Sequence, residues 1–428
     1  MQILFRCCKI IDSSSPYHLN KLDIRIINGV IDEIGEDLSL NNALEVKVKN
    51  CSVSPAWIDL EAEAGDPGLE HREDLESLAQ AALAGGYTRL GLRPHTEPAI
   101  QDKAGVSYLI QQSRSLPITI LPIGALSKDT EGKEITEMLD MRQTGVVAFS
   151  DGVHGVQHAG ILQRALLYVK TFDGLVMNQA LDKSIAGKGQ LHEGVISTSL
   201  GMKGIPSLAE ELMIERDLKL LEYTDSRLHI SHVTTTKGLE SIRKAKKKGL
   251  KVTTSVSALH LLETVEALSG FNSYYKVMPP LRAETDRLAL IKGLKDGTID
   301  CISSNHCPRE TEAKELEFAY ADFGAAMLST AFAAARTGID DALSEEELIS
   351  LLTTKPAEIY GLSVAKIKEK QQAELTFYQF DEQWTPTLND IKSKSKNAPL
   401  IGKKLKGKVI GVLNDKQIFG FKGVIDEV

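Results

Sequence analysis

Residues 54–68, with the sequence SPAWIDLEAEAGDPG, mark the point where the pattern of the chain changes. The stretch starts as an apolar strand, carries carboxylates at Glu61 and Glu63, and ends in the loop-forming residues GDPG. Because alternate side chains of a strand point the same way, we expect the two glutamates to share one face. Short strands precede this stretch, and apolar strands separated by amphipathic helices follow it.

Eight candidate strands follow one another from Trp57 onward: AWIDLE, YTRLGL, ITILPIGAL, VVAFS, LVMNQAL, RLHISHV, KVTTSVS and DCISSN. Helical stretches lie between them, such as REDLESLAQAALAGG, whose Gly85 and Gly86 suit a helix C-terminus, and SLAEELMIERDLKLLEYT. Eight such units in roughly 250 residues predict an α/β fold, the (β/α)8 TIM barrel. We place this barrel at residues 55–362.

Both ends of the chain consist of short strand candidates. Residues 1–54 contain MQILFRCCKII, DIRIINGVIDEIG and ALEVKVKN, with a turn expected at Asn28 and Gly29. SEEELISLLTTKPAEIYG is expected to form one helix, and residues 363–428 then return to strands in AELTFYQF, GKVIGVLN and KQIFGF. We therefore predict one small β-sandwich domain, built from both termini beside the barrel.

Composition excludes some classes of partner. The formal net charge of −8 argues against a nucleic acid or an anionic membrane as the main partner. The five cysteines are odd in number and scattered, as in reduced intracellular proteins. No apolar run approaches the roughly 20 residues that span a bilayer, and the N-terminus lacks the apolar core of a signal peptide. We expect a cytoplasmic protein.

A series of motifs then identifies a resemblance. In chain order they are IDLEAEAGDPGLEHREDLES, AALAGGYT, RPHTEPAIQDK, AFSDG, LGMKGIPSLAEELMIERDL, RLHISHVTT, KVMPPLRAETDR, LKDGTIDCISSNHCP and SKSKNAPLIG. Together, and at this spacing, they resemble the dihydroorotases of the amidohydrolase superfamily over nearly the whole chain. The resemblance implies a metal-dependent hydrolase barrel that opens the cyclic amide of dihydroorotate, or forms it from carbamoyl aspartate, in pyrimidine synthesis.

The resemblance also assigns the metal ligands, and most of them are replaced here. Two histidines one residue apart at the end of the first strand correspond to Glu61 and Glu63, and a histidine of the fifth strand corresponds to Asn178. Two ligand positions are retained, at Asp151 and His232. Glutamate can bind zinc or harder metal ions, so a refitted metal site stays an alternative.

The general base is replaced as well. The aspartate that binds metal and takes the proton of the attacking water in the family corresponds to Asn305. An amide oxygen is not basic enough to accept that proton, and general base catalysis alone is worth roughly 10²- to 10⁴-fold. The resemblance therefore implies a catalytically degenerate site, and we expect no bound cofactor unless the refitted site holds zinc.

Substrate-binding positions have also changed. The family's carboxylate-binding arginine and asparagine correspond to Gly65 and His95, a further asparagine to Met278, and a closing histidine to Arg309. A desolvated carboxylate needs paired donors, so this pocket should bind dihydroorotate poorly. His95 and Arg309 could form a different clamp.

One cation is placed to offset the carboxylates. Arg93 ends the second strand, two residues from His95, where the family usually has an apolar residue. Without a metal, Glu61 and Glu63 would repel each other and resist ionisation. We predict that Arg93 fills the former metal site by pairing with them. The alternative is that Arg93 points to solvent and that the glutamates are hydrated.

Three hypotheses about function remain open. The first is a non-catalytic homologue that acts as a structural partner of the catalytic subunit of aspartate transcarbamoylase, in a homo- or hetero-oligomer, with neither nucleic acid nor membrane involved. The second is an active cyclic-amide hydrolase with a refitted metal site. The third is a sensor that binds a small ligand in the emptied pocket.

Overall fold

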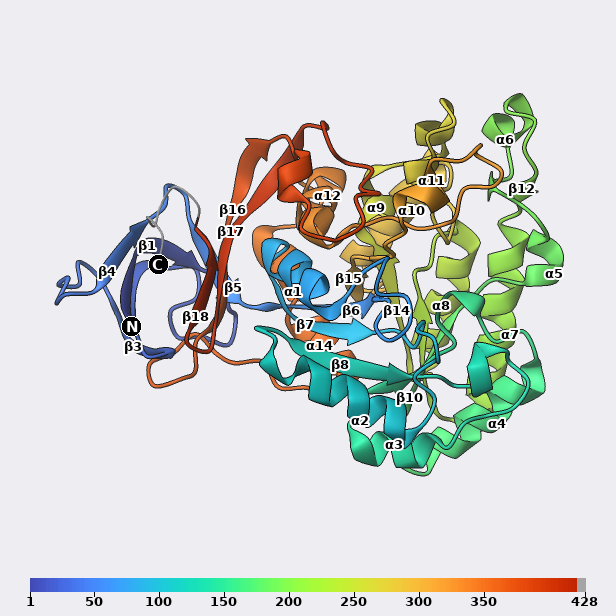
Figure 1. Cartoon of the computed structure of the whole chain (residues 1–428), viewed down its shortest axis with the longest axis horizontal. Helices are drawn as coiled ribbons and strands as arrows, with labels where there is room; N and C mark the ends of the chain where they lie inside the picture. The colour runs from blue at the N-terminus through green and yellow to red at the C-terminus, as the bar shows by residue number, and fades with distance from the viewer. Residues whose placement is uncertain (422–428) are drawn as a thin grey trace.

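Eight parallel strands form the barrel at the centre of the computed structural model, which describes residues 1–421 (Figure 1). They pair in chain order: β6 (Trp57–Ala62), β7 (Tyr87–Leu92), β8 (Thr119–Gly124), β9 (Ala148–Phe149), β10 (Leu175–Gln179), β13 (Arg227–Ser231), β14 (Val252–Ser257) and β15 (Cys301–Ser303). A parallel bridge between Ala62 and His306 joins the first strand to the segment after the last one. The predicted (β/α)8 fold is confirmed.

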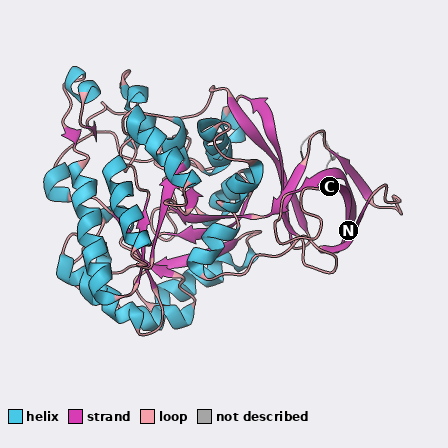
Figure 2. Ribbon diagram, turned by 180° about the vertical axis from the view of Figure 1, so that it is seen from behind, coloured by secondary structure: helices cyan, strands magenta, loops and turns pink. Residues whose placement is uncertain are grey.

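Helices surround the barrel strands on the outside (Figure 2). The main ones are α1 (Leu75–Ala84), α2 (Lys103–Gln112), α3 (Met138–Thr144), α4 (Ala159–Lys170), α7 (Leu208–Thr224), α8 (Thr236–Lys247), α10 (Glu284–Lys295), α12 (Ala331–Ile339) and α14 (Thr354–Tyr360). The shorter α5 (Lys183–Ala186), α6 (Val195–Ser199), α9 (Ala258–Leu262), α11 (Thr311–Lys314) and α13 (Glu345–Ser350) lie in the connections. Among residues 1–421, none of these helices is long and apolar enough to cross a membrane.

A second sheet combines both ends of the chain. Its strands are β1 (Gln2–Ile10), β2 (Lys21–Ile27), β3 (Val30–Gly35), β4 (Leu44–Lys47), β5 (Ser52–Pro55), β16 (Glu374–Trp384), β17 (Leu405–Asn414) and β18 (Gln417–Gly420). Strand β5 pairs with β1 on one side and β16 on the other, so the termini meet in one sheet (Figure 1). Asn28 and Gly29 have φ angles of 50° and 80°, which suit the predicted tight turn between β2 and β3.

The stretch 344–361 departs from the prediction. It forms two helices, α13 and α14, instead of one. Pro356 lies in the first turn of α14, where its missing N–H is tolerated. A proline deep inside a longer helix would clash with the preceding turn, so the break just before it has a local cause.

Apolar side chains close one end of the barrel. A buried cluster inside it includes Leu60, Met177, Cys301 and Tyr360. Along the chain, the first three come before the polar residues Glu61, Asn178 and Asn305, the last of which follows its strand. The N-terminal end of the barrel is therefore packed with apolar groups, and its polar groups gather at the C-terminal end.

Candidate functional site

The predicted site residues collect at the C-terminal ends of the barrel strands. Glu61 lies in β6, and Arg93 comes directly after β7. His232 follows β13, and Asn305 lies two residues after β15. Both of these residues have positive φ angles, 52° and 50°, which few residues other than glycine adopt. The surrounding structure therefore holds them in place against local backbone preference.

The guanidinium of Arg93 lies at the centre of this group, with 1% of the side chain exposed. Its Nη2 is 3.2 Å from His232 Nδ1 and 3.1 Å from Asn305 Oδ1. Its Nη1 is 3.3 Å from Glu63 Oε1, and its Nε is 3.5 Å from Glu61 Oε1. Because arginine only donates hydrogen bonds, the ring nitrogen and the amide oxygen are acceptors. A permanent positive charge thus touches positions that the resemblance assigns to metal ligands and general base.

Burial and the charge of Arg93 set the protonation of this centre. Burial raises the pKa of Glu61, and attraction to Arg93 offsets only part of the rise. The pKa of His232 lies well below its ordinary value because the ring is buried and because Arg93 is adjacent. The His232 ring is therefore neutral at physiological pH, in agreement with its accepting Nδ1.

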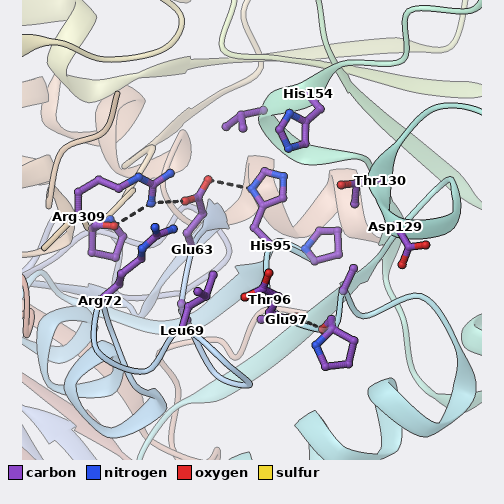
Figure 3. Close-up of a pocket in the computed structure, with 17 residues that line it drawn as sticks. Glu63, Leu69, Arg72, His95, Thr96, Glu97, Asp129, Thr130, His154 and Arg309 are labelled. Atoms are coloured by element: carbon purple, nitrogen blue, oxygen red, sulfur yellow. Dashed lines mark hydrogen bonds and ion pairs between the residues drawn. The ribbon is translucent and has the colours of Figure 1, made fainter. Parts of the chain in front are cut away.

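Both carboxylate oxygens of Glu63 have partners, and Figure 3 shows two of these partners, His95 and Arg309. Its Oε1 lies 3.1 Å from His95 Nδ1 as well as 3.3 Å from Arg93 Nη1. Its Oε2 accepts from Arg309 Nη1 and from the Cys307 thiol, both at 3.0 Å. Burial alone would raise the pKa of Glu63, but Arg309, His95 and Arg93 hold it well below its ordinary value. The carboxylate is therefore ionised.

Two of the assigned ligand positions turn away from Arg93. The Asp151 carboxylate accepts hydrogen bonds from the Ser127 backbone N–H at 2.8 Å and from its hydroxyl at 2.5 Å. Asn178 donates from Nδ2 to Asp217 Oδ2 at 2.6 Å and accepts from the Val156 N–H at 2.9 Å. Their polar atoms are thus occupied by neighbouring loops and helix α7.

The side chains do not fit a zinc ion in this arrangement. In residues 1–421 no group of three or more His, Cys, Asp or Glu side chains is placed to hold a metal. The candidate ligands that remain at the centre, Glu61, Glu63 and His232, all face the guanidinium of Arg93. A zinc site needs three or four such ligands around a shared free position.

A cavity of about 470 Å³ opens above Glu63, and Gly65, His95 and Arg309 line it. Met278 lies instead on an adjoining cavity of about 310 Å³, with Arg309 on the wall of both. His95 and Arg309 do come together, but their shared partner is Glu63. The clamp that these two residues could form thus already holds a carboxylate of the protein itself.

Gly65, the position that the resemblance assigns to a carboxylate-binding arginine, has no room for a side chain. A Cβ atom at this residue would lie 1.9 Å from the carbonyl oxygen of Leu69. The turn is fixed by hydrogen bonds from the Gly65 N–H to the Glu73 carbonyl at 2.7 Å and from the Leu69 N–H to the Gly65 carbonyl at 2.5 Å. Any side chain at this position would require the loop to move.

Sequence reasoning missed the contacts that hold the site. Ser127, Asp217 and Cys307 contact Asp151, Asn178 and Glu63 respectively. Each is 24 or more residues from its partner, so no local pattern identifies the pair. Of these three residues, only Cys307 lies close in sequence to an expected site residue, two residues after Asn305.

Two histidines, His154 and His158, follow Asp151 four residues apart, but they do not share a helix. His154 ends a short 3-10 turn (Gly152–His154), and its ring lies 5.3 Å from the His95 ring. His158 is the N-cap of α4, where its Nδ1 accepts from the Gly160 N–H at 3.2 Å. His158 therefore has a local structural role, and His154 lines the larger cavity.

Comparison with known proteins agrees with this architecture. Residues 52–238 match the family described as Dihydro-orotase-like, and residues 179–415 match the Amidohydrolase family. A dihydroorotase of Acetivibrio thermocellus is 37% identical over 391 residues, covering 91% of this chain and 92% of that protein. A dihydroorotase of Syntrophotalea carbinolica is 34% identical over 420 residues, covering 98% of this chain and 99% of that protein.

Solved structures with the same fold are more distant in sequence. The L-hydantoinase (dihydropyrimidinase) of Arthrobacter aurescens superimposes with a TM-score of 0.84 at 22% identity, covering 99% of this chain and 97% of that one. The dihydropyrimidinase of Brevibacillus agri gives 0.83 at 19% identity, covering 99% and 96%. These likenesses concern the fold. Because the two family matches and the dihydroorotase relatives cover nearly the whole chain, the protein belongs to the dihydroorotase-like proteins of the amidohydrolase family.

Proposed function

We propose that this protein is a non-catalytic member of the dihydroorotase-like proteins in pyrimidine metabolism. The observation that carries the proposal is the position of Arg93, whose guanidinium contacts Glu61, Glu63, His232 and Asn305 at 3.1–3.5 Å. In an active enzyme of this type a metal ion would occupy the space between such residues and lower the pKa of a bound water to about 7. An arginine supplies the charge and no water-activating chemistry.

The residue at the position that the resemblance assigns to the general base supports the same proposal. Asn305 accepts from Arg93 at Oδ1 and donates from Nδ2 to the Met278 carbonyl at 3.1 Å. Both ends of the amide are engaged, and neither can take a proton from water at neutral pH. Loss of this step alone costs roughly 10²- to 10⁴-fold in rate.

An activity assay tests the proposal. Purified protein, supplied in turn with zinc, manganese and magnesium, should neither hydrolyse dihydroorotate nor cyclise carbamoyl aspartate above background. A dihydroorotase relative assayed in the same buffers is the positive control. Turnover in the ordinary enzyme range of about 1 to 10³ s⁻¹ that chelators abolish would overturn the proposal. It would favour the alternative, in which Glu61, Glu63 and His232 bind a metal after Arg93 swings out.

We further propose a structural role beside the catalytic subunit of aspartate transcarbamoylase, in the cytoplasm and without a cofactor. The support is the resemblance, since inactive relatives of this kind are associated with that enzyme. Mixing the two cognate proteins should give a larger species in sedimentation velocity than either alone. An unrelated acidic protein of similar size is the control. Two unchanged sedimentation boundaries would remove this partner.

A further inference from the structure

The carboxylate of Glu63 is surrounded by donors from separate parts of the barrel rim. Arg93 and His95 follow strand β7, and Cys307 and Arg309 follow strand β15. All four contacts lie between 3.0 and 3.3 Å, with two donors on each oxygen. By contrast, Oε2 of the neighbouring Glu61 has no hydrogen-bond partner in residues 1–421. The rim is built around one carboxylate.

Charge explains why that carboxylate is needed. Arg93 and Arg309 are permanently positive, and both contact Glu63. In the described part of the chain, Arg309 has an ion pair with no other carboxylate. Their side chains are 1% and 14% exposed, so water compensates little of this charge. Removing the anion would leave the Arg309 guanidinium with no carboxylate partner in residues 1–421, and Arg93 with Glu61 alone.

We propose that Arg93, His95 and Arg309 form an anion-binding site whose resident ligand is the protein's own Glu63 carboxylate, and that a small carboxylate binds there when Glu63 is absent or displaced. The inference deepens the proposed loss of catalysis and rests on it, because a working metal site would need Glu63 and Arg93 elsewhere.

Access and shape define the ligand class. Glu63, His95 and Arg309 all line the cavity of about 470 Å³, so a molecule in that cavity reaches the position of the Glu63 side chain. Figure 3 shows the carboxylate between the Arg309 guanidinium and the His95 ring. Paired donors on both oxygens suit a planar carboxylate. Formate and acetate are the smallest probes of this class.

Chemical rescue tests the site. Glu63→Ala should unfold at a lower temperature than the wild type, and formate should raise its Tm by a few degrees in a saturable manner. Sodium chloride at equal ionic strength should not raise the Tm of Glu63→Ala, and formate should not change the Tm of the wild type. Asp59→Ala is the matched control, because Asp59 is a buried carboxylate whose donors are the Ser304 N–H, at 2.8 Å, and hydroxyl. Because its hydrogen-bond donors are a backbone N–H and a hydroxyl and not guanidinium groups, the Asp59→Ala cavity should show no rescue.

A response to chloride equal to that to formate, or no response of Glu63→Ala at all, would overturn the proposal. If Glu63→Ala does not fold, Glu63→Gln keeps the side-chain volume and allows a double-mutant cycle with Arg309→Gln. The Arg309 substitution should then lower Tm less in the Glu63→Gln background than in the wild type. Additive effects would refute the site. These readouts measure stability, so their failure is distinct from a positive activity assay.

Discussion

Nη2 of Arg93 lies 3.2 Å from Nδ1 of His232, and Nε2 of the same ring lies 3.3 Å from the Ser303 hydroxyl. A ring nitrogen that accepts a hydrogen bond cannot give the same lone pair to a metal. His232 is therefore held in place by an arginine and a serine. A metal could bind it only after one of these contacts breaks.

Replacing Arg93 should destabilise the protein. In Arg93→Met the buried Glu61 and Glu63 lose the cation between them, a defect that typically costs about 3–5 kcal/mol. Urea unfolding at neutral pH measures the loss. Arg243→Met is the control, since the Arg243–Asp296 pair is 30% and 35% exposed and should cost about 1 kcal/mol or less. Equal losses in the two variants would contradict a central role for Arg93.

In a variant with histidines at positions 61 and 63, zinc should bind only when Arg93 is also replaced. Glu61→His with Glu63→His supplies two imidazoles beside His232, a ligand set that suits zinc. With Arg93 present, we expect no stoichiometric zinc after dialysis, because the guanidinium keeps its contact with His232. Adding Arg93→Met should give one zinc per chain and a zinc-dependent rise in Tm. Similar zinc contents in the double and triple variants would show that Arg93 is no barrier.

Gly65 should tolerate no side chain. In Gly65→Ala the new Cβ would meet the Leu69 carbonyl oxygen at 1.9 Å, so the loop must shift. Such overpacking typically costs about 1–3 kcal/mol. Gly270→Ala is the control, because a Cβ there meets nothing within 4 Å. Thermal unfolding should separate the two variants, and equal midpoints would mean that the 65–69 turn relaxes freely.

Lys314 should make stability depend on pH. Its Nζ donates to the backbone oxygens of Asp322 at 2.7 Å and Gly324 at 3.0 Å, and burial lowers its pKa to about 7. An unfolded lysine has a pKa of about 10.4. Between these values the unfolded chain holds a proton that the folded chain lacks, so the free energy of unfolding rises with pH.

The comparison with Lys314→Met isolates this contribution. Between about pH 7 and pH 9, the wild type should gain up to about 1.4 kcal/mol per pH unit relative to the variant. Urea unfolding at several pH values gives the difference. Parallel pH profiles of the two proteins would mean that the ammonium stays protonated among its carbonyl partners.

Local pattern was sufficient for the barrel. Each of the eight apolar runs from AWIDLE to DCISSN became a strand, because a parallel strand buried on both faces needs apolar residues whatever its neighbours are. The split of 344–361 into α13 and α14 also had a local signal, Pro356, which the single-helix prediction overlooked. That Asn305 is an amide and cannot act as a general base is likewise a matter of residue type alone.

Pairing among the polar groups depended on the folded chain. The sequence places Glu61, Glu63 and Arg93 on neighbouring strands, but it cannot say that Glu63 also binds Arg309, which lies 246 residues away. Nor can it say that Asp151 turns to Ser127 while His232 turns to Arg93. A strand needs only its own residues to be apolar. A buried charge takes whichever donors come within about 3 Å, and only the closed barrel decides which donors those are.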